Sequence, residues 1–187
     1  MKRIIIAIVV VLSCLLYAGG AAIASTPEID SHVESYSELY PAELDQLEID
    51  NIGMHCADAQ SSLRAPLANL SSIKTKYLGA YALVEMRLSA VQKRLIRQQV
   101  DTSAIDLLIA NYRLDVQGYE KSFDDYKIAL EDIVGMNCAG SPFGFVSTLY
   151  AVRQRRSDVA RAVDKIDQYL ASNTKTSFDA IKKSLEE

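Results

Sequence analysis

Cysteine and histidine are the side chains of this sequence that could do the most chemistry. Cys14 lies in an apolar N-terminal stretch, whereas Cys56 and Cys138 lie in the more polar remainder of the chain. His55 precedes Cys56, but one His-Cys pair and one distant cysteine lack the clustered spacing of a zinc site. We therefore predict no bound metal and a structural disulfide between Cys56 and Cys138, provided that the chain folds in an oxidising compartment.

The N-terminus has the features of an export signal. A short basic start precedes an uncharged, mostly aliphatic stretch over residues 4–17, and the Ala-Ile-Ala of residues 22–24 is a pattern that signal peptidases cut. We expect residues 1–24 to be a cleaved signal peptide and the mature protein to be extracytoplasmic: periplasmic, at the cell surface or secreted. The alternative is an uncleaved anchor over residues 4–24, a stretch just long enough to span a bilayer. Cleavage would remove Cys14 and leave an even number of cysteines.

No pattern for catalysis or cofactor binding stands out in the sequence. His32 and His55 have the spacing of neither a metal-binding helix nor a haem attachment. A glycine-rich phosphate loop, a nucleophile elbow and a Glu-x-x-His pair are absent from the sequence. Neighbouring acidic pairs, such as Glu131 and Asp132, are interpreted as a solvated helix face. We therefore predict a protein that is not an enzyme and has no cofactor.

Charge divides the sequence into two zones. Residues 25–63 hold nine acidic side chains and no lysine or arginine, whereas the rest of the chain from Arg64 holds 18 basic and 15 acidic side chains, a net charge of +3. We predict an acidic arm or linker over residues 25–62 and a helical hairpin with a third helix and a tail over residues 63–187. The arm is either a solubilising spacer or a segment that docks on the basic bundle or on a basic partner. An exported acidic protein is not expected to bind nucleic acid.

Three stretches repeat mostly apolar residues at alternating spacings of four and three, which is the pattern of a coiled-coil seam. Lys74 and Arg156 are the two cations that occupy seam positions. A break near residues 100–103, where Ser103 and Asp106 resemble a capping box, and a second break at residues 140–142 separate the three stretches. The seams are Leu63, Leu67, Leu70, Tyr77, Tyr81, Val84, Leu88, Val91 and Leu95; Ile105, Ile109, Tyr112, Val116, Tyr119, Phe123, Tyr126, Leu130 and Ile133; and Phe145, Leu149, Val152, Val159, Val163, Ile166 and Leu170. They predict an all-α fold: an antiparallel three-helix coiled coil or elongated helical bundle, with an N-terminal signal segment and a short C-terminal helix.

One register aligns the three seams, and it brings two cations to the same level. Tyr81 faces Tyr119 in this register, and Lys74 and Arg156 both lie opposite Tyr126. Two cations at one core layer are costly unless they are paired or reach water. Either their charges extend outward to neighbouring carboxylates and the layer fixes helix register or oligomer state, or the layer binds an anion. The second option is our alternative function, a helical-bundle binding module for an anionic ligand.

The C-terminal segment has an apolar stripe of its own. After Leu170 the third seam ends, and Phe178, Ile181 and Leu185 begin a stripe on a shifted face. We expect this segment either to fold back over the hairpin tip at Asn173 or to project towards a partner, and the stripe is our candidate partner surface. The sequence therefore predicts an exported structural or adaptor protein that binds another envelope or extracellular protein, and it is compatible with an oligomer.

Overall fold

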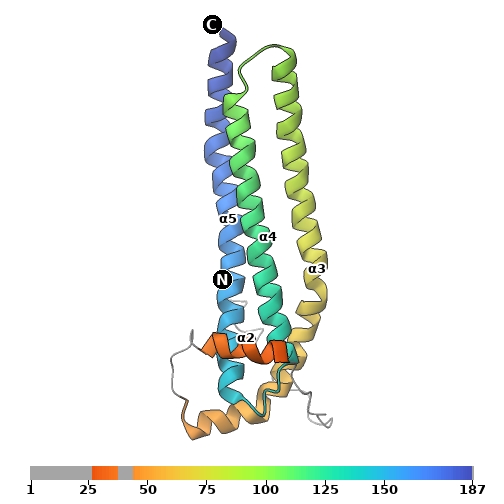
Figure 1. The fold of residues 1–187 in the computed structure, drawn as a ribbon, viewed down its shortest axis with the longest axis vertical. Coiled ribbons are helices and arrows are strands. Elements are labelled where there is room, and N and C mark those ends of the chain that lie inside the picture. Colours follow the sequence, from red (N-terminus) through yellow and green to blue (C-terminus); the bar gives the residue numbers. More distant parts are fainter. Residues whose placement is uncertain (1–26, 38–43, 187) are drawn as a thin grey trace, which may run out of the picture.

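The described part of the chain is a long helical bundle with a short helix across one end. The computed structural model describes residues 27–37 and 44–186, and its regular elements there are α2 (Pro27–Ser37), α3 (Gln46–Arg97), α4 (Ser103–Gly135) and α5 (Pro142–Glu186). Helices α3, α4 and α5 run side by side, and α2 crosses one end of the bundle (Figure 1). The predicted all-α bundle is confirmed, whereas the predicted signal segment or anchor lies outside the described residues.

Helix α3 begins well before the predicted boundary at residue 63. A capping box starts it: the backbone N–H of Glu48 donates to the Asp45 side chain at 2.8 Å, and the backbone N–H of Asp45 donates to the Glu48 side chain at 3.0 Å. Residues 46–62, which the charge pattern assigns to the acidic arm, are therefore the first turns of a 52-residue helix. Pro66 lies inside α3, where its missing N–H removes one backbone hydrogen bond of the helix. The part of α3 beneath the bundle is bent away from the part along α4 (Figure 1).

The α3–α4 hairpin has the predicted register. The rings of Tyr81 and Tyr119 meet edge to face with centroids 5.3 Å apart, and the Tyr112 hydroxyl donates to the Tyr81 carbonyl oxygen at 2.9 Å. The predicted capping box of Ser103 and Asp106 was wrong, because α4 has Thr102 as its N-cap residue and the backbone N–H of Ser103 donates to the Asp101 side chain at 3.0 Å.

Helix α4 is the central helix of the bundle. It packs extensively against both α3 and α5, while α3 and α5 contact each other little. Helix α5 runs antiparallel to α4, and Lys165 pairs with Asp115 at 2.7 Å. Tyr119 and Phe123 are buried with ring centroids 5.8 Å apart, and the 42% exposed Tyr77 packs against Tyr119 at a centroid distance of 5.9 Å.

The C-terminal segment neither folds back nor projects, so both expectations for it were wrong. Helix α5 passes through Asn173 without a turn and extends along the hairpin to its tip (Figure 1). Ile181 is 6% exposed and packs in one apolar cluster with Leu88, Leu95 and Ile105. Because the end of α5 packs against these apolar side chains of the hairpin, α5 continues as one helix to Glu186. The predicted separate short C-terminal helix is therefore not formed.

Candidate functional site

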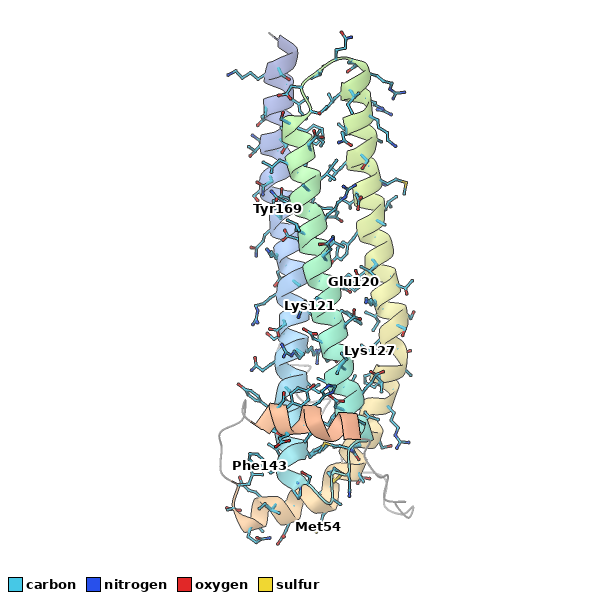
Figure 2. The ribbon with its side chains drawn as sticks, viewed as in Figure 1. Met54, Glu120, Lys121, Lys127, Phe143 and Tyr169 are labelled. Atoms are coloured by element: carbon cyan, nitrogen blue, oxygen red, sulfur yellow. A yellow bond between two sulfur atoms is a disulfide. The ribbon has the colours of Figure 1, made fainter. Side chains whose placement is uncertain are left out.

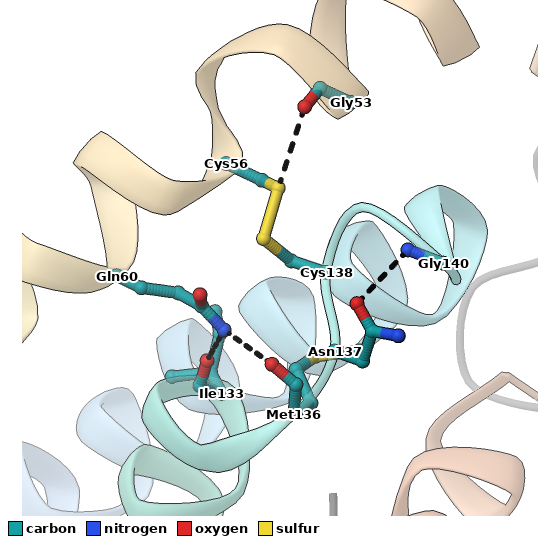
Figure 3. Close-up of a disulfide and its surroundings, with 8 residues drawn as sticks. All are labelled: Gly53, Cys56, Gln60, Ile133, Met136, Asn137, Cys138 and Gly140. Carbon is teal, nitrogen blue, oxygen red and sulfur yellow. Dashed lines mark hydrogen bonds between the residues drawn. A yellow bond between two sulfur atoms is a disulfide. The ribbon is translucent and has the colours of Figure 1, made fainter. Parts of the chain in front are cut away.

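A disulfide and an amide fasten α3 to the turn between α4 and α5. The predicted bond between Cys56 and Cys138 is present, with sulfur atoms 2.06 Å apart and Cα atoms 5.9 Å apart (Figure 3). The Gln60 side-chain nitrogen donates to the carbonyl oxygens of Ile133 at 2.7 Å and Met136 at 2.8 Å. These carbonyls lie at the end of α4, where a helix leaves its acceptors unpaired. The two links therefore fix the N-terminal part of α3 to the base of the bundle.

A cluster of titratable side chains joins α2 to α4. The Asp132 carboxylate is buried, with its side chain 5% exposed, and its Oδ2 accepts a hydrogen bond from the Tyr36 hydroxyl at 2.9 Å. The Nδ1 atom of His32 lies 3.2 Å from the same oxygen. The interpretation of Asp132 as part of a solvated face was wrong, because α2 covers that face of α4.

Burial determines the protonation behaviour of this cluster. It raises the pKa of Asp132 above its ordinary value, and the hydrogen bonds from Tyr36 and His32 lower it by a smaller amount. Burial also raises the pKa of the Tyr36 phenol well above its usual range, so this hydroxyl remains a donor. A carboxylate that receives donors from one short helix is suited to hold that helix in place. In residues 27–37 and 44–186, no three His, Cys, Asp or Glu side chains gather in a way that could hold a metal ion.

Two glycines let α2 come close to the bundle. A Cβ atom at Gly135 would lie 2.7 Å from the Ile29 Cδ1 atom, and one at Gly144 would lie 2.8 Å from the Val33 Cγ1 atom. Both distances are far below the separation at which carbon atoms attract each other. Ile29, Val33 and Tyr36 follow the i, i+4, i+7 spacing of one helix face. The surface that receives them, which we call the α2 seat, consists of Asp132, Gly135 and Gly144.

The two predicted cations, Lys74 and Arg156, do not form a buried layer with Tyr126, because Arg156 is exposed. The Lys74 Nζ atom lies 2.7 Å from Asp124 and 3.6 Å from Glu120, and the hydrogen bond to Asp124 raises the Lys74 pKa. Arg156 is exposed on α5, and the Tyr126 ring packs edge to face against Phe123 with centroids 6.4 Å apart. Because carboxylates already balance the Lys74 charge, this geometry favours the register interpretation over an anion site.

The predicted partner stripe at the C-terminus is not a continuous surface. Ile181 belongs to the core, Phe178 is 40% exposed, and the Leu185 side chain lies outside the described residues. Phe178 alone therefore remains from the predicted stripe as a described exposed side chain.

Helix α4 carries a different row of apolar side chains on its outer side. Leu107, Leu114 and Ile128 are 63%, 62% and 41% exposed, and their separation by whole heptads places them on one stripe of the helix. We call these three residues the α4 row. Lys121 occupies the intervening heptad position, pairs with Asp125 at 3.0 Å, and lies at mid-height of the bundle (Figure 2). The seam pattern of the sequence does not reveal this row, because its residues lie outside the seams.

Comparison with known proteins adds no information on the family or function of this chain. The chain matches no protein-family model, no curated protein and no solved structure. Among the described residues, no helix has both the length and the apolar content needed to cross a bilayer. The assignment of a function therefore rests on the geometry of the α2 seat and the α4 row.

Replacement of Asp132 by asparagine is expected to alter how stability depends on pH. Because the folded-state pKa of Asp132 is raised above the reference value of 3.8, the folded protein binds this proton more tightly than the unfolded chain. The resulting stabilisation is complete below the unfolded pKa and is lost as pH rises through the folded pKa. The amide introduced by Asp132→Asn would keep an acceptor for Tyr36 without titrating.

We therefore expect the stability of Asp132→Asn relative to the wild type to increase as the pH rises from 4 to 7. Urea denaturation at both pH values measures this change. Asp125→Asn is the control, since the Asp125 side chain is 33% exposed and pairs with Lys121 at the surface. A difference between Asp132→Asn and the wild type that stays constant with pH would contradict the assignment.

Proposed function

We propose that this protein is an exported helical adaptor, without enzymatic activity, that binds another envelope or extracellular protein through the α4 row. The observation that carries the proposal is the exposure of Leu107, Leu114 and Ile128 along one stripe of the central helix. Single exposed leucines are common on protein surfaces, so the proposal rests on the alignment of three exposed apolar side chains along one stripe of α4.

The spacing of the row favours a helix as the contacting element. Side chains one heptad apart on a helix lie on one stripe, so an element that runs along α4 can contact all of them. From Leu107 to Ile128 the row extends over about 30 Å at the rise of an α-helix. A partner helix lying along α4 would cover the row and pack its side chains around Lys121.

The disulfide supports export. Bonds such as that between Cys56 and Cys138 persist in oxidising compartments and are rare in the cytosol, which agrees with the location that the predicted signal over residues 1–24 implies. Anchorage by residues 4–24 is the alternative form of the same proposal, since an anchored bundle would also present the α4 row outside the cytoplasm.

The polar groups at and beside the α2 seat form hydrogen bonds within the protein, and this supports a role that is not catalytic. Asp132 accepts a hydrogen bond from the side chain of Tyr36 and lies within reach of His32. The hydroxyls of Ser147 and Thr148 both donate to the Gly144 carbonyl oxygen of their own helix, at 3.0 Å and 2.7 Å. These contacts use the polar groups to fix the structure.

The test is the double variant Leu107→Ser/Leu114→Ser. Because both side chains are exposed, we expect the free energy of unfolding to change by less than about 0.5 kcal/mol. We expect the amount of partner recovered after mild crosslinking in the native cell envelope to fall at least tenfold. Leu83→Ser/Met86→Ser on α3 is the matched control, with side chains 47% and 62% exposed. Equal recovery by both double variants would reject the α4 row as the binding surface.

A further inference from the structure

We propose that the side-chain hydroxyls of Tyr81 and Tyr119 form an internal binding site for a small uncharged molecule that accepts hydrogen bonds. The acceptor is either a water molecule or the oxygen of a small organic molecule such as a ketone. The site lies where α3 meets α4, apart from the α4 row and the α2 seat, and the inference does not depend on the proposed function.

The two hydroxyls are buried and lack a partner in the described part of the chain. Tyr119 is 1% exposed and Tyr81 is 8% exposed, and neither phenol oxygen has a hydrogen-bond partner among residues 27–37 and 44–186. Buried polar side-chain atoms nearly always form a hydrogen bond, because an unpaired one costs the free energy of its removal from water. A pair of such hydroxyls in one cluster therefore points to an acceptor that is not part of the described chain.

Packing alone does not explain why these two positions hold tyrosine. The Tyr81 and Tyr119 rings meet edge to face with centroids 5.3 Å apart, and phenylalanine rings could make the same contact. Phe123 packs against Tyr119 in this cluster without a hydroxyl. Tyr112 differs from both, because its hydroxyl donates to the Tyr81 carbonyl oxygen at 2.9 Å. The hydroxyls of Tyr81 and Tyr119 are thus the part of the cluster that packing does not use.

The surroundings of the hydroxyls favour an uncharged acceptor. Burial raises the pKa of Tyr81 to about 12 and holds the pKa of Tyr119 well above its usual range, so both phenols keep their protons and can donate. Besides burial, the groups that raise the Tyr119 pKa are the phenols of Tyr81 and Tyr77. No described lysine or arginine acts on it, so an anion would be buried there without a counterion, which is costly.

A small molecule can reach the site past Tyr77. The Tyr77 ring packs on Tyr119 and Tyr81 with centroid distances of 5.9 Å and 6.2 Å, and it is 42% exposed. Exposed side chains change rotamer within nanoseconds, so movement of this ring would uncover the two buried rings. The carboxylate of Asp167 on α5 also raises the Tyr81 pKa, which agrees with a Tyr81 phenol directed towards α5. We therefore expect entry between α3 and α5, which contact each other little.

The first experiment compares urea denaturation of the wild type, Tyr81→Phe, Tyr119→Phe and the double variant. With an acceptor bound, each single substitution should raise the equilibrium constant for unfolding about tenfold, because it removes one hydrogen bond. The double variant should be less destabilised than the two single effects combined, because the second substitution removes a hydroxyl that the first left unpaired. Tyr112→Phe is the matched control, since its buried hydroxyl has a partner within the chain and its loss should be destabilising whatever the site holds.

The second experiment identifies the source of the acceptor. Acetophenone, an uncharged aromatic ketone, is added to the wild type and to Tyr81→Phe/Tyr119→Phe, and ethylbenzene serves as the probe without an acceptor. If the site takes an organic molecule, the melting temperatures should show acetophenone binding the wild type about tenfold more tightly than the double variant, with no such difference for ethylbenzene. If acetophenone does not distinguish the two forms while the single phenylalanine variants are destabilised, the acceptor is an internal water.

The inference is overturned if Tyr81→Phe and Tyr119→Phe are at least as stable as the wild type and acetophenone stabilises the wild type and the double variant equally. That result would show that the two hydroxyls are simply unpaired. Neither experiment uses a partner protein, so the outcome is separate from the Leu107→Ser/Leu114→Ser test of the proposed function.

Discussion

Replacement of both Cys56 and Cys138 by serine is expected to lower the free energy of unfolding by about 4 kcal/mol, in the chain-entropy description of crosslinked unfolded states. The bond joins residues 82 positions apart, so it removes much of the freedom of the unfolded chain. It also closes the base of the bundle, where Gln60 would be left to hold the start of α3 to the end of α4 by its two hydrogen bonds.

Chemical denaturation of the wild type and the double variant, with and without reductant, measures this effect. The reduced wild type should match the double variant, and the double variant should not respond to reductant. Gln60→Ala is a useful comparison, because it should destabilise the same junction by about 1–3 kcal/mol through loss of buried hydrogen bonds while leaving the crosslink intact. A reduced wild type as stable as the oxidised one would show that the bond does not restrain this fold.

Replacement of Ile181 by alanine is expected to lower the free energy of unfolding by about 2–4 kcal/mol. Ile181 is 6% exposed and packs with Leu88, Leu95 and Ile105 near the hairpin tip. Its truncation would leave a cavity between α5 and the hairpin, and removal of residues 174–187 should destabilise the protein further. Phe178→Ala is the control, since Phe178 lies on the same segment but is 40% exposed, and its effect should be about 1 kcal/mol or less.

Thermal and urea denaturation of Ile181→Ala, Phe178→Ala and the truncated chain test whether the C-terminal segment packs in the core. An unchanged melting temperature for the truncated chain would contradict the packing of Ile181 and restore the segment as a candidate for partner binding. A larger effect of Phe178→Ala than of Ile181→Ala would contradict the orientation of this part of α5.

The sequence predicted the hairpin well because apolar periodicity reflects burial directly. The meeting of Tyr81 and Tyr119 follows from the spacing of the two seams, since every seam position must face the partner helix. The Cys56–Cys138 bond follows from the expectation of export, because cleavage of the predicted signal would leave these two cysteines in an oxidising compartment. The start of α3 could also have been found, because Asp45 and Glu48 have the spacing of a capping box.

The α2 seat could not be predicted from the apolar periodicity of the sequence. Asp132 lies on what would be the solvent side of α4, and α2, which is distant in sequence, covers it. Nothing in the sequence near Gly135 or Gly144 indicates that Ile29 and Val33 come close to them. Such tertiary contacts override the expectation from local pattern, and the position of Ile181 against the hairpin tip is another example.

The most direct test of the α4 row is photo-crosslinking in the native cell envelope from a benzoylphenylalanine placed at Leu114. We predict that Leu114 and Ile128 give crosslinks to the same second protein, whereas the exposed control positions Met86 on α3 and Arg161 on α5 do not. Equal crosslinks from row and control positions, or crosslinks from the row to a second copy of this chain alone, would contradict the adaptor proposal.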